Sequence, residues 1–297
     1  MRRTDLALEA REIIEGKEEI SGVILEEENK YGNLVKVTKM KIESNHGSQI
    51  MGKPKGVYIT IESKEERKEP LLKAIVEQIK KIVEDKGIKK ILVVGLGNRE
   101  ITPDALGPWV IDQLFVTRHL IKEFGQEFQK KYNIHDISAI APGVMAQTGI
   151  ESGEIIGGII KKLDIDGIIA IDALAARKVQ RLYKTIQITD TGISPGAGVG
   201  NNRKVLNKEN LGVEVIAIGI PTVVDAETIV EDRVESSLLK AGFSQKEVDI
   251  FINQMVHGED RNMFVTGKEV DEKVKNLSEI LAEAINISFV KAFTNLS

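Results

Sequence analysis

The stretch Gly167-Ile-Ile-Ala-Ile171-Asp172 decides the fold class, because a short apolar run between a glycine and a carboxylate is typical of a strand buried on both faces. The runs Ile91-Leu-Val-Val94 and Val213-Glu-Val-Ile-Ala-Ile218 have the same character. Segments with helical spacing lie between these runs, from Trp109 to Phe124 and from Ile150 to Leu163. Strands that alternate with helices predict an α/β fold with a mostly parallel twisted sheet and helices on both faces.

The segments outside this core predict a small antiparallel addition near the N-terminus. Residues 35–42 and 57–61 alternate apolar and polar side chains, so we expect an antiparallel strand pair. Residues 185–188 alternate in the same way and suggest an edge strand or a hairpin arm. A helix capped by Thr4 is expected over 4–15. The other expected elements are a helix from Pro70 to Gly87, a strand over 138–141, and helices near 225–240, 244–257 and 268–293.

Composition limits the classes of function. The chain has 297 residues with 42% hydrophobic and 29% charged side chains, which suits a single α/β domain over residues 1–297. Its net charge of -4 lacks the basic footprint of a nucleic-acid or lipid-surface protein. The N-terminal Met1-Arg2-Arg3 leads into Thr4-Asp5-Leu6 rather than an apolar stretch, so we expect a cytoplasmic protein without membrane contact.

Two carboxylates follow buried runs, where open α/β sheets bind their ligands. Asp172 comes directly after the run at 167–171, and Asp104 lies in the longer loop that begins Gly95-Leu-Gly97-Asn98. That loop partly matches a dinucleotide-binding motif, but Glu100 stands where the third glycine is needed. For both aspartates the alternative role is a cap or turn, which is a common use of this residue.

Glycine-rich segments could provide contacts to a substrate. The loop at 192–203 contains Gly196 and Gly198, whose backbone N–H groups could bind a peptide or an oxyanion, although a mobile connection explains the loop equally well. Gly97 and Asn98 are the other expected substrate-binding residues. Asp225 is interpreted as a cap of the next helix.

Elimination favours chemistry by carboxylates. The sequence has no cysteine, no Gly-x-Ser-x-Gly motif and no two histidines with the spacing of metal ligands. Two neighbouring aspartates do not both ionise easily, so one can hold a proton while the other accepts one from water. Such a pair can hydrolyse an amide bond, and we therefore expect Asp104 and Asp172 to be catalytic, with no metal and no cofactor.

Several motifs resemble those of the germination proteases of endospore-forming bacteria, over nearly the whole chain. They include Gly95-Leu-Gly-Asn98, Thr102-Pro-Asp-Ala-Leu-Gly-Pro108, Val116-Thr-Arg-His-Leu120, Ala141-Pro-Gly-Val-Met145, Ile171-Asp-Ala-Leu-Ala175, the glycines of 192–200, Gly219-Ile-Pro-Thr222 and Met263-Phe-Val-Thr266. The resemblance implies an atypical aspartic-type endopeptidase with a phosphorylase/hydrolase-like fold similar to that of hydrogenase maturation proteases. The family's proposed catalytic aspartates fall on Asp104 and Asp172.

The resemblance also implies a biological setting. Such enzymes begin the degradation of the small acid-soluble proteins that protect spore DNA, cutting after a Glu that precedes an apolar residue. They are tetramers in the spore core, made as zymogens with a short N-terminal prosegment. The family motif Arg3-Thr-Asp-Leu-Ala7 stands close to the start of this sequence, so the prosegment is either very short or already removed.

Two alternatives to the two-carboxylate protease remain open. The first is a metal-dependent peptidase that uses the same aspartates as ligands, as in the maturation proteases. It is weakened because no histidine follows the run at 213–218. The second is a non-catalytic binding module or nucleotide-binding protein, against which the incomplete glycine motif already counts.

Overall fold

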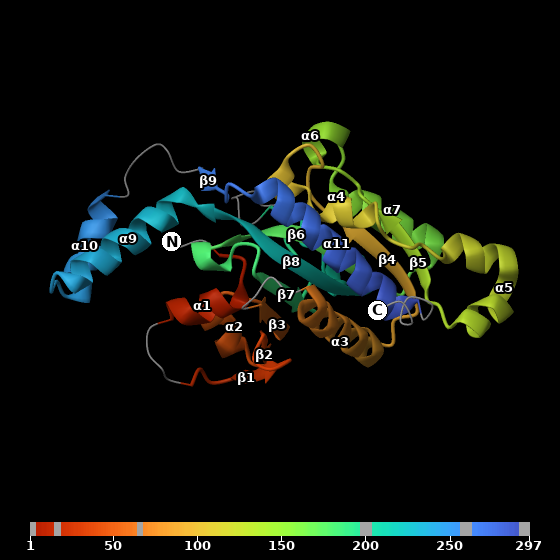
Figure 1. Cartoon of the computed structure of the whole chain (residues 1–297), viewed down its shortest axis with the longest axis horizontal. Coiled ribbons are helices and arrows are strands. Elements are labelled where there is room, and N and C mark those ends of the chain that lie inside the picture. Colours follow the sequence, from red (N-terminus) through yellow and green to blue (C-terminus); the bar gives the residue numbers. More distant parts are fainter. Residues whose placement is uncertain (1–3, 15–18, 64–67, 197–203, 256–262, 291–297) are drawn as a thin grey trace.

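One mixed sheet forms the centre of the molecule (Figure 1). The computed structural model describes residues 4–14, 19–63, 68–196, 204–255 and 263–290. Within these residues, the strands are β1 (Val23–Lys30), β2 (Val35–Ile42), β3 (Gly56–Ser63), β4 (Lys90–Gly95), β5 (Asp136–Ile140), β6 (Gly167–Ala176), β7 (Thr185–Thr189), β8 (Glu214–Asp225) and β9 (Phe264–Val265). Their order is β1-β2-β3-β7-β8-β6-β4-β5, and β9 pairs with β8.

The prediction of a mostly parallel sheet is correct for only part of the sheet. Strands β8, β6, β4 and β5 pair in parallel, as expected, but β1, β2, β3 and β7 form an antiparallel half that continues to β8. The eight residues 177–184 join β6 to β7. Parallel strands of one sheet need a crossover of a dozen or more residues, so this short connection brings the chain back antiparallel to β6, on the far side of β8. The predicted antiparallel pair is confirmed as β2 and β3.

Helices cover both faces of the sheet. They are α1 (Ala7–Ile13), α2 (Asn45–Met51), α3 (Lys68–Lys86), α4 (Leu106–Ile111), α5 (Arg118–Tyr132), α6 (Met145–Thr148), α7 (Ser152–Leu163), α8 (Lys208–Leu211), α9 (Ala226–Lys240), α10 (Gln245–Met255) and α11 (Val270–Phe289). Short 3-10 turns are η1 (Thr102–Asp104) and η2 (Val179–Arg181). Helix α11 packs between α3 and α4 over one face, and α7 lies on the opposite face.

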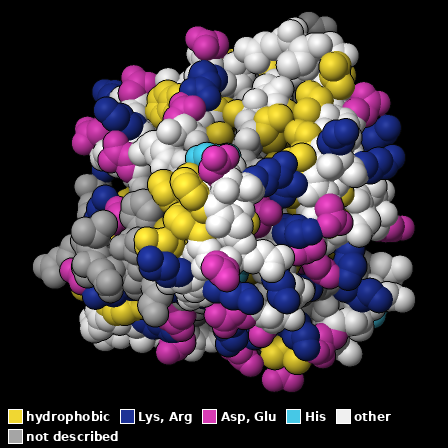
Figure 2. Space-filling model, turned by 90° about the vertical axis from the view of Figure 1, so that its right-hand side faces the viewer, with side chains coloured by type: hydrophobic (Ala, Val, Ile, Leu, Met, Phe, Trp, Pro, Cys, Tyr) yellow, Lys and Arg dark blue, Asp and Glu magenta, His cyan; other side chains and the backbone are white. Residues whose placement is uncertain are grey.

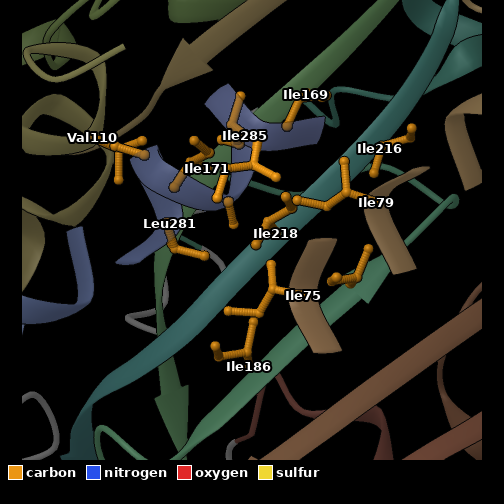
Figure 3. Close-up of a cluster of buried hydrophobic side chains, with 14 of the residues drawn as sticks. Ile75, Ile79, Val110, Ile169, Ile171, Ile186, Ile216, Ile218, Leu281 and Ile285 are labelled. Carbon is orange, nitrogen blue, oxygen red and sulfur yellow. The ribbon is translucent and has the colours of Figure 1, made fainter. Parts of the chain in front are cut away.

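Alternation along the central strands produces two cores. On β6, Ile169 and Ile171 face α3 and α11, whereas Ile168 and Ala170 face α7. Figure 3 shows the larger core, in which β-branched residues of the strands meet residues of α3, α4 and α11: Ile75, Ile79, Val110, Ile169, Ile171, Ile186, Ile216, Ile218, Leu281 and Ile285. Burial on both faces explains why these strands read as continuous apolar runs.

Tertiary contacts interrupt the helix that was expected from Trp109 to Phe124. Helix α4 ends at Ile111 and α5 begins only at Arg118. In the interval, the Phe115 N–H donates to Asn286 Oδ1 at 2.8 Å, and the Thr117 N–H donates to the Ile137 carbonyl at 3.1 Å. These bonds to α11 and β5 satisfy backbone groups that a continuous helix would have used.

The other differences concern strand ends and the first helix. Strand β7 lies inside the sheet between β3 and β8 rather than at an edge, and all five of its residues are buried. Its polar Gln187 is paired, since its Oε1 accepts from the Ala7 N–H at 2.7 Å. Helix α1 begins at Ala7 and not at Thr4, whose hydroxyl accepts from the Leu6 N–H at 3.1 Å. The expected helices α3, α7, α9, α10 and α11 are confirmed, apart from positions that lie outside the described residues.

The surface has mixed charge on the side shown in Figure 2. Over the described residues of this face, Lys and Arg side chains lie among Asp and Glu side chains, with apolar patches between them. Interspersed charges of both signs do not build a strong field of one sign. Among the described residues, no helix is both long enough and apolar enough to cross a bilayer.

Candidate active site

A cavity of about 610 Å³ opens beyond the carboxyl ends of the parallel strands. Its walls come from the loop after β4, from the second halves of β6 and β8, and from β7 and the turn at 52–54. Both predicted catalytic residues, Asp104 and Asp172, line it. This is the position at which α/β sheets bind ligands.

Asp172 lies within a strand, whereas the sequence analysis placed it directly after the strand at 167–171. Strand β6 continues to Ala176, and Asp172 pairs in register with Gly219 of β8. The side chain is 5% exposed, and its Oδ1 accepts from the Ala173 N–H at 2.9 Å. A carboxyl held on a central strand has little freedom of position, which suits a group that must meet a substrate in one geometry.

Asp104 ends the short η1 turn and is held by the loop that precedes it. Its Oδ2 accepts from the Asn98 N–H at 2.6 Å. The alternative role as a cap of the next helix is not realised, because α4 has Ala105 as its N-cap residue and no side-chain capping bond. Gly97 has φ of +110°, and a Cβ there would stand 2.0 Å from the Asp104 carbonyl oxygen. Position 97 therefore requires glycine.

Adjacent parallel strands bring the two aspartates to one cavity. Gly95 at the end of β4 pairs with Ile171 on β6, and the Leu96 N–H donates to the Ile171 carbonyl at 2.8 Å. The chain then turns over the sheet edge into η1 and α4. Gly107 of α4 packs against this junction, since a Cβ there would lie 2.4 Å from Leu96 O and 2.6 Å from Ile171 O.

The four predicted substrate-binding residues have different placements. Gly97 and Gly196 line the cavity. Asn98 is not among the lining residues, and its Oδ1 accepts from the Glu100 N–H at 3.1 Å and from Gln147 Nε2 at 2.9 Å. Gly198 lies outside the described residues. Two of the three described positions thus line the cavity, and the third, Asn98, contacts Asp104 through its backbone N–H.

Two charged residues that the sequence did not single out also line the cavity. The Asp5 carboxylate accepts from the Ala175 N–H at 2.8 Å, and burial raises the pKa of Asp5 above its usual value. Lys53 Nζ donates to the Asp5 carbonyl at 3.0 Å, and burial lowers the pKa of Lys53. Asp5 falls in the Arg-Thr-Asp-Leu-Ala motif, which was a usable signal. Lys53 lies in a turn with no motif of its own.

The geometry bears on the two alternative functions. The backbone carbonyl of Asp104 occupies the space above Gly97, where a dinucleotide-binding loop needs room for a pyrophosphate. Gly97 therefore allows the close approach of Asp104, and Gly95 allows that of Gly107, whose carbonyl oxygen would lie 2.3 Å from a Cβ at position 95. Within the described residues, no group of three or more His, Asp or Glu side chains is arranged to hold a metal ion. Asp225 has the expected capping role, accepting from the Glu227 N–H at 2.8 Å.

The two carboxyl groups and the size of the cavity indicate the chemistry that the site can support. Two carboxyl groups on different elements face one cavity, which is large enough for several residues of an extended peptide. One carboxyl is almost buried and the other is half-buried, so their surroundings differ. Such a pair can divide the roles of proton acceptor and proton donor.

The chain is similar to proteins of one known family. A family model described as Germination protease matches residues 2–259. The germination protease of Caldanaerobacter subterraneus subsp. tengcongensis is 41% identical, covering 98% of this chain and 95% of the relative. That of Clostridium perfringens is 40% identical over 96% of this chain and 94% of the relative. That of Bacillus cytotoxicus is 39% identical over 96% and 92%, respectively.

A solved structure was also matched. It is the [NiFe] hydrogenase maturation protease HycI from Thermococcus kodakarensis, with 16% sequence identity and a TM-score of 0.36. The match covers 70% of this chain and 98% of that protein.

Proposed function

The chain belongs to the germination protease family, and we propose that it is the endopeptidase that begins the degradation of small acid-soluble spore proteins, with Asp104 and Asp172 as its catalytic carboxyls. Family membership supports the activity and the substrate class. One observation supports the two residues: both carboxyls line the same cavity beyond the parallel strands.

The proposed reaction is hydrolysis of a peptide bond by water. The ionised carboxyl accepts a proton from water as the water oxygen bonds to the carbonyl carbon, while the protonated carboxyl donates to the carbonyl oxygen. In the second step the carboxyl that took the proton from water donates a proton to the nitrogen, and the C–N bond breaks. The other carboxylate takes a proton from one hydroxyl of the tetrahedral intermediate. The products are a carboxylic acid and an amine, and the pair again holds one proton.

Neighbouring groups support this reaction in the proposal. The Asn98 N–H holds Oδ2 of Asp104 at 2.6 Å, which directs the remaining lone pairs of that carboxyl. The backbone at Gly196 can approach an extended peptide closely, because this residue carries no side chain, and Gly97 lines the same cavity beside Asp104. Placement of the scissile bond between the two carboxyls would provide most of the orientation that the reaction needs.

The family resemblance implies three further properties, which we propose for this chain as well. They are assembly as a homotetramer, production as a zymogen that loses a short N-terminal segment, and action in the spore core. Light scattering of the purified chain tests the first, and N-terminal sequencing before and after incubation tests the second.

The direct test is incubation with a small acid-soluble spore protein, followed by an SDS gel and a mass spectrum. Asp104→Asn and Asp172→Asn should each lose at least about a hundredfold in kcat, the usual contribution of an acid or base. Asp164→Asn is the matched control, because Asp164 precedes β6 at its opposite end and pairs with Lys90 on the surface. Full activity in Asp172→Asn would refute the assigned roles.

The metal-dependent alternative is separated by one more arm. Wild-type protein is dialysed against a strong chelator and assayed with and without added Zn²⁺ or Mn²⁺. Unchanged activity after chelation would eliminate the metal-dependent mechanism. Activity that disappears and returns with one metal would replace the two-carboxylate mechanism by a metal site built on the same aspartates.

A further inference from the structure

Strands β6 and β8 contain an irregularity beside the cavity. Leu174 pairs with Pro221, but the next residue of β6, Ala175, pairs with Val223. Thr222 is therefore an extra residue on β8 with no partner on β6. Pro221 has no N–H to give to the ladder, which favours a break in pairing at this point. Bulges of this kind redirect a side chain and are common next to active sites.

The side chain that this bulge redirects reaches the turn carrying Asp104. Thr222 Oγ1 donates to the carbonyl of Pro103 at 2.6 Å, and Thr222 is 1% exposed. Pro103 is the residue directly before Asp104 in η1. This bond links β8 to η1, two elements whose bonded residues are 119 positions apart in the sequence.

The carbonyl of Thr222 is fixed as well. Thr266 Oγ1 lies 2.8 Å from it and the Tyr183 hydroxyl lies 3.2 Å from it, both as donors. The Tyr183 N–H also donates to the Pro221 carbonyl at 3.0 Å. Tyr183 has φ of +61°, a conformation that non-glycine residues adopt only where the surroundings impose it. Thr222 thus has little freedom to move at either end.

We propose that Thr222 is a positioning residue, which sets the place of the Asp104 carboxyl through its bond to Pro103. The proposal rests on the proposed function, since it assigns Asp104 to the reaction. Asp104 is held from one side by the Asn98 N–H and from the other, one residue earlier, by Thr222. Without the hydroxyl of Thr222, η1 loses this hydrogen bond to β8, while its contacts to its own loop, to α4, to α11 and to β6 remain.

The test compares two substitutions at this position. Thr222→Val keeps the shape of the side chain and removes the donor, whereas Thr222→Ser keeps the donor. The matched control is Thr38→Val, because Thr38 is also a buried sheet threonine but its hydroxyl has no partner and lies on β2, away from the cavity. Each variant is assayed for kcat and KM on the spore-protein substrate, and its melting temperature confirms folding.

A second readout does not depend on activity. Amide hydrogen exchange is followed over residues 97–105 in the same four proteins. The Asn98 amide reports directly, since its proton is bonded to Asp104. Loosening of η1 should speed exchange in this segment in Thr222→Val and leave it unchanged in Thr222→Ser and Thr38→Val.

We expect Thr222→Val to lose about ten- to a hundredfold in kcat with KM nearly unchanged, because a misplacement of about 1 Å at a catalytic group has effects of this size. Thr222→Ser should restore most of the loss. Normal kcat and normal exchange in a folded Thr222→Val would overturn the proposal, as would equal losses in Thr222→Ser and Thr222→Val. If wild-type protein leaves the substrate intact, the proposed function fails, and the exchange measurement still decides whether Thr222 positions η1.

Discussion

Replacing Gly97 with alanine would place a methyl group against Asp104, the residue that we propose as a catalytic carboxyl. The added Cβ would stand 2.0 Å from the Asp104 carbonyl oxygen, whereas ordinary contact begins at 3.4 Å, so the two must separate by about 1.4 Å. The atom encountered is backbone, which cannot rotate away. The loop at 97 or the η1 turn must therefore shift.

The magnitude follows from that shift. A displacement of about 1 Å at a catalytic group costs on the order of a hundredfold in rate. The positive φ of +110° adds backbone strain of about 1–3 kcal/mol to the folded state. We therefore expect Gly97→Ala to lose at least about a hundredfold in kcat and to melt at a lower temperature.

Gly87→Ala separates these two effects. Gly87 also has a positive φ, of +65°, but a Cβ there meets nothing within 4 Å. It follows the end of α3, away from the cavity. This variant should share the loss of stability and keep its kcat. Cleavage of the spore protein, quantified by mass spectrometry, is the assay. A folded Gly97→Ala with wild-type kcat, or a Gly87→Ala with an equal loss of kcat, would refute the reasoning.

The remaining predictions concern two carboxylates of α1 that pair with residues 177–181, the buried Glu9 and the more exposed Glu12. Glu9 is 0% exposed, accepts from the Arg177 N–H at 2.6 Å and lies 3.3 Å from Arg181, so Glu9→Ala should lower the free energy of unfolding by about 3 kcal/mol in urea titrations. The pKa of Glu12 is lowered: burial opposes the shift, but the bonds from Arg181 and Lys178 outweigh it. A carboxylate whose pKa is lowered by folding stabilises the folded state above its unfolded pKa of 4.5, and this stabilisation is lost as the pH falls. Glu12→Gln should therefore reduce the fall of the unfolding free energy at acid pH.

The predictions for Glu9 and Glu12 each have a control. Glu69→Ala removes an exposed carboxylate that pairs with Lys73 on α3, and it should change the unfolding free energy much less than Glu9→Ala. Similar losses in the two variants would contradict the argument from burial. For Glu12, wild-type and variant curves that run parallel from neutral pH to below pH 4.5 would show that its carboxylate is not linked to folding.

Local patterns were sufficient for much of the fold. The largely apolar runs at 91–94, 167–171 and 213–218 predicted β4, β6 and β8, because burial on both faces leaves few polar positions in the sequence. Helical spacing predicted α3 and α7 for the corresponding reason. These signals extend over a few residues, so they can be read without knowing what the segment packs against.

The placement of β7 and the break between α4 and α5 could not be predicted in this way. Alternation in 185–188 is the same for an edge strand as for an internal strand whose polar side chains are paired, as Gln187 is with Ala7. The helical spacing from Trp109 onward continues through a segment that bonds to Asn286 and β5 instead. In both cases the partner is more than a hundred residues away or belongs to another element.

The sequence by itself determined the α/β class, the family and the two aspartates that we propose as catalytic, because each depends on residue types at short spacing. Only the tertiary structure decided that Asp172 lies within a strand, and that Lys53 and Asp5 share its cavity. The same holds for the bond from Thr222 to Pro103. These features depend on strand order and on a one-residue bulge, which arise when distant segments pair and leave no mark in the local pattern.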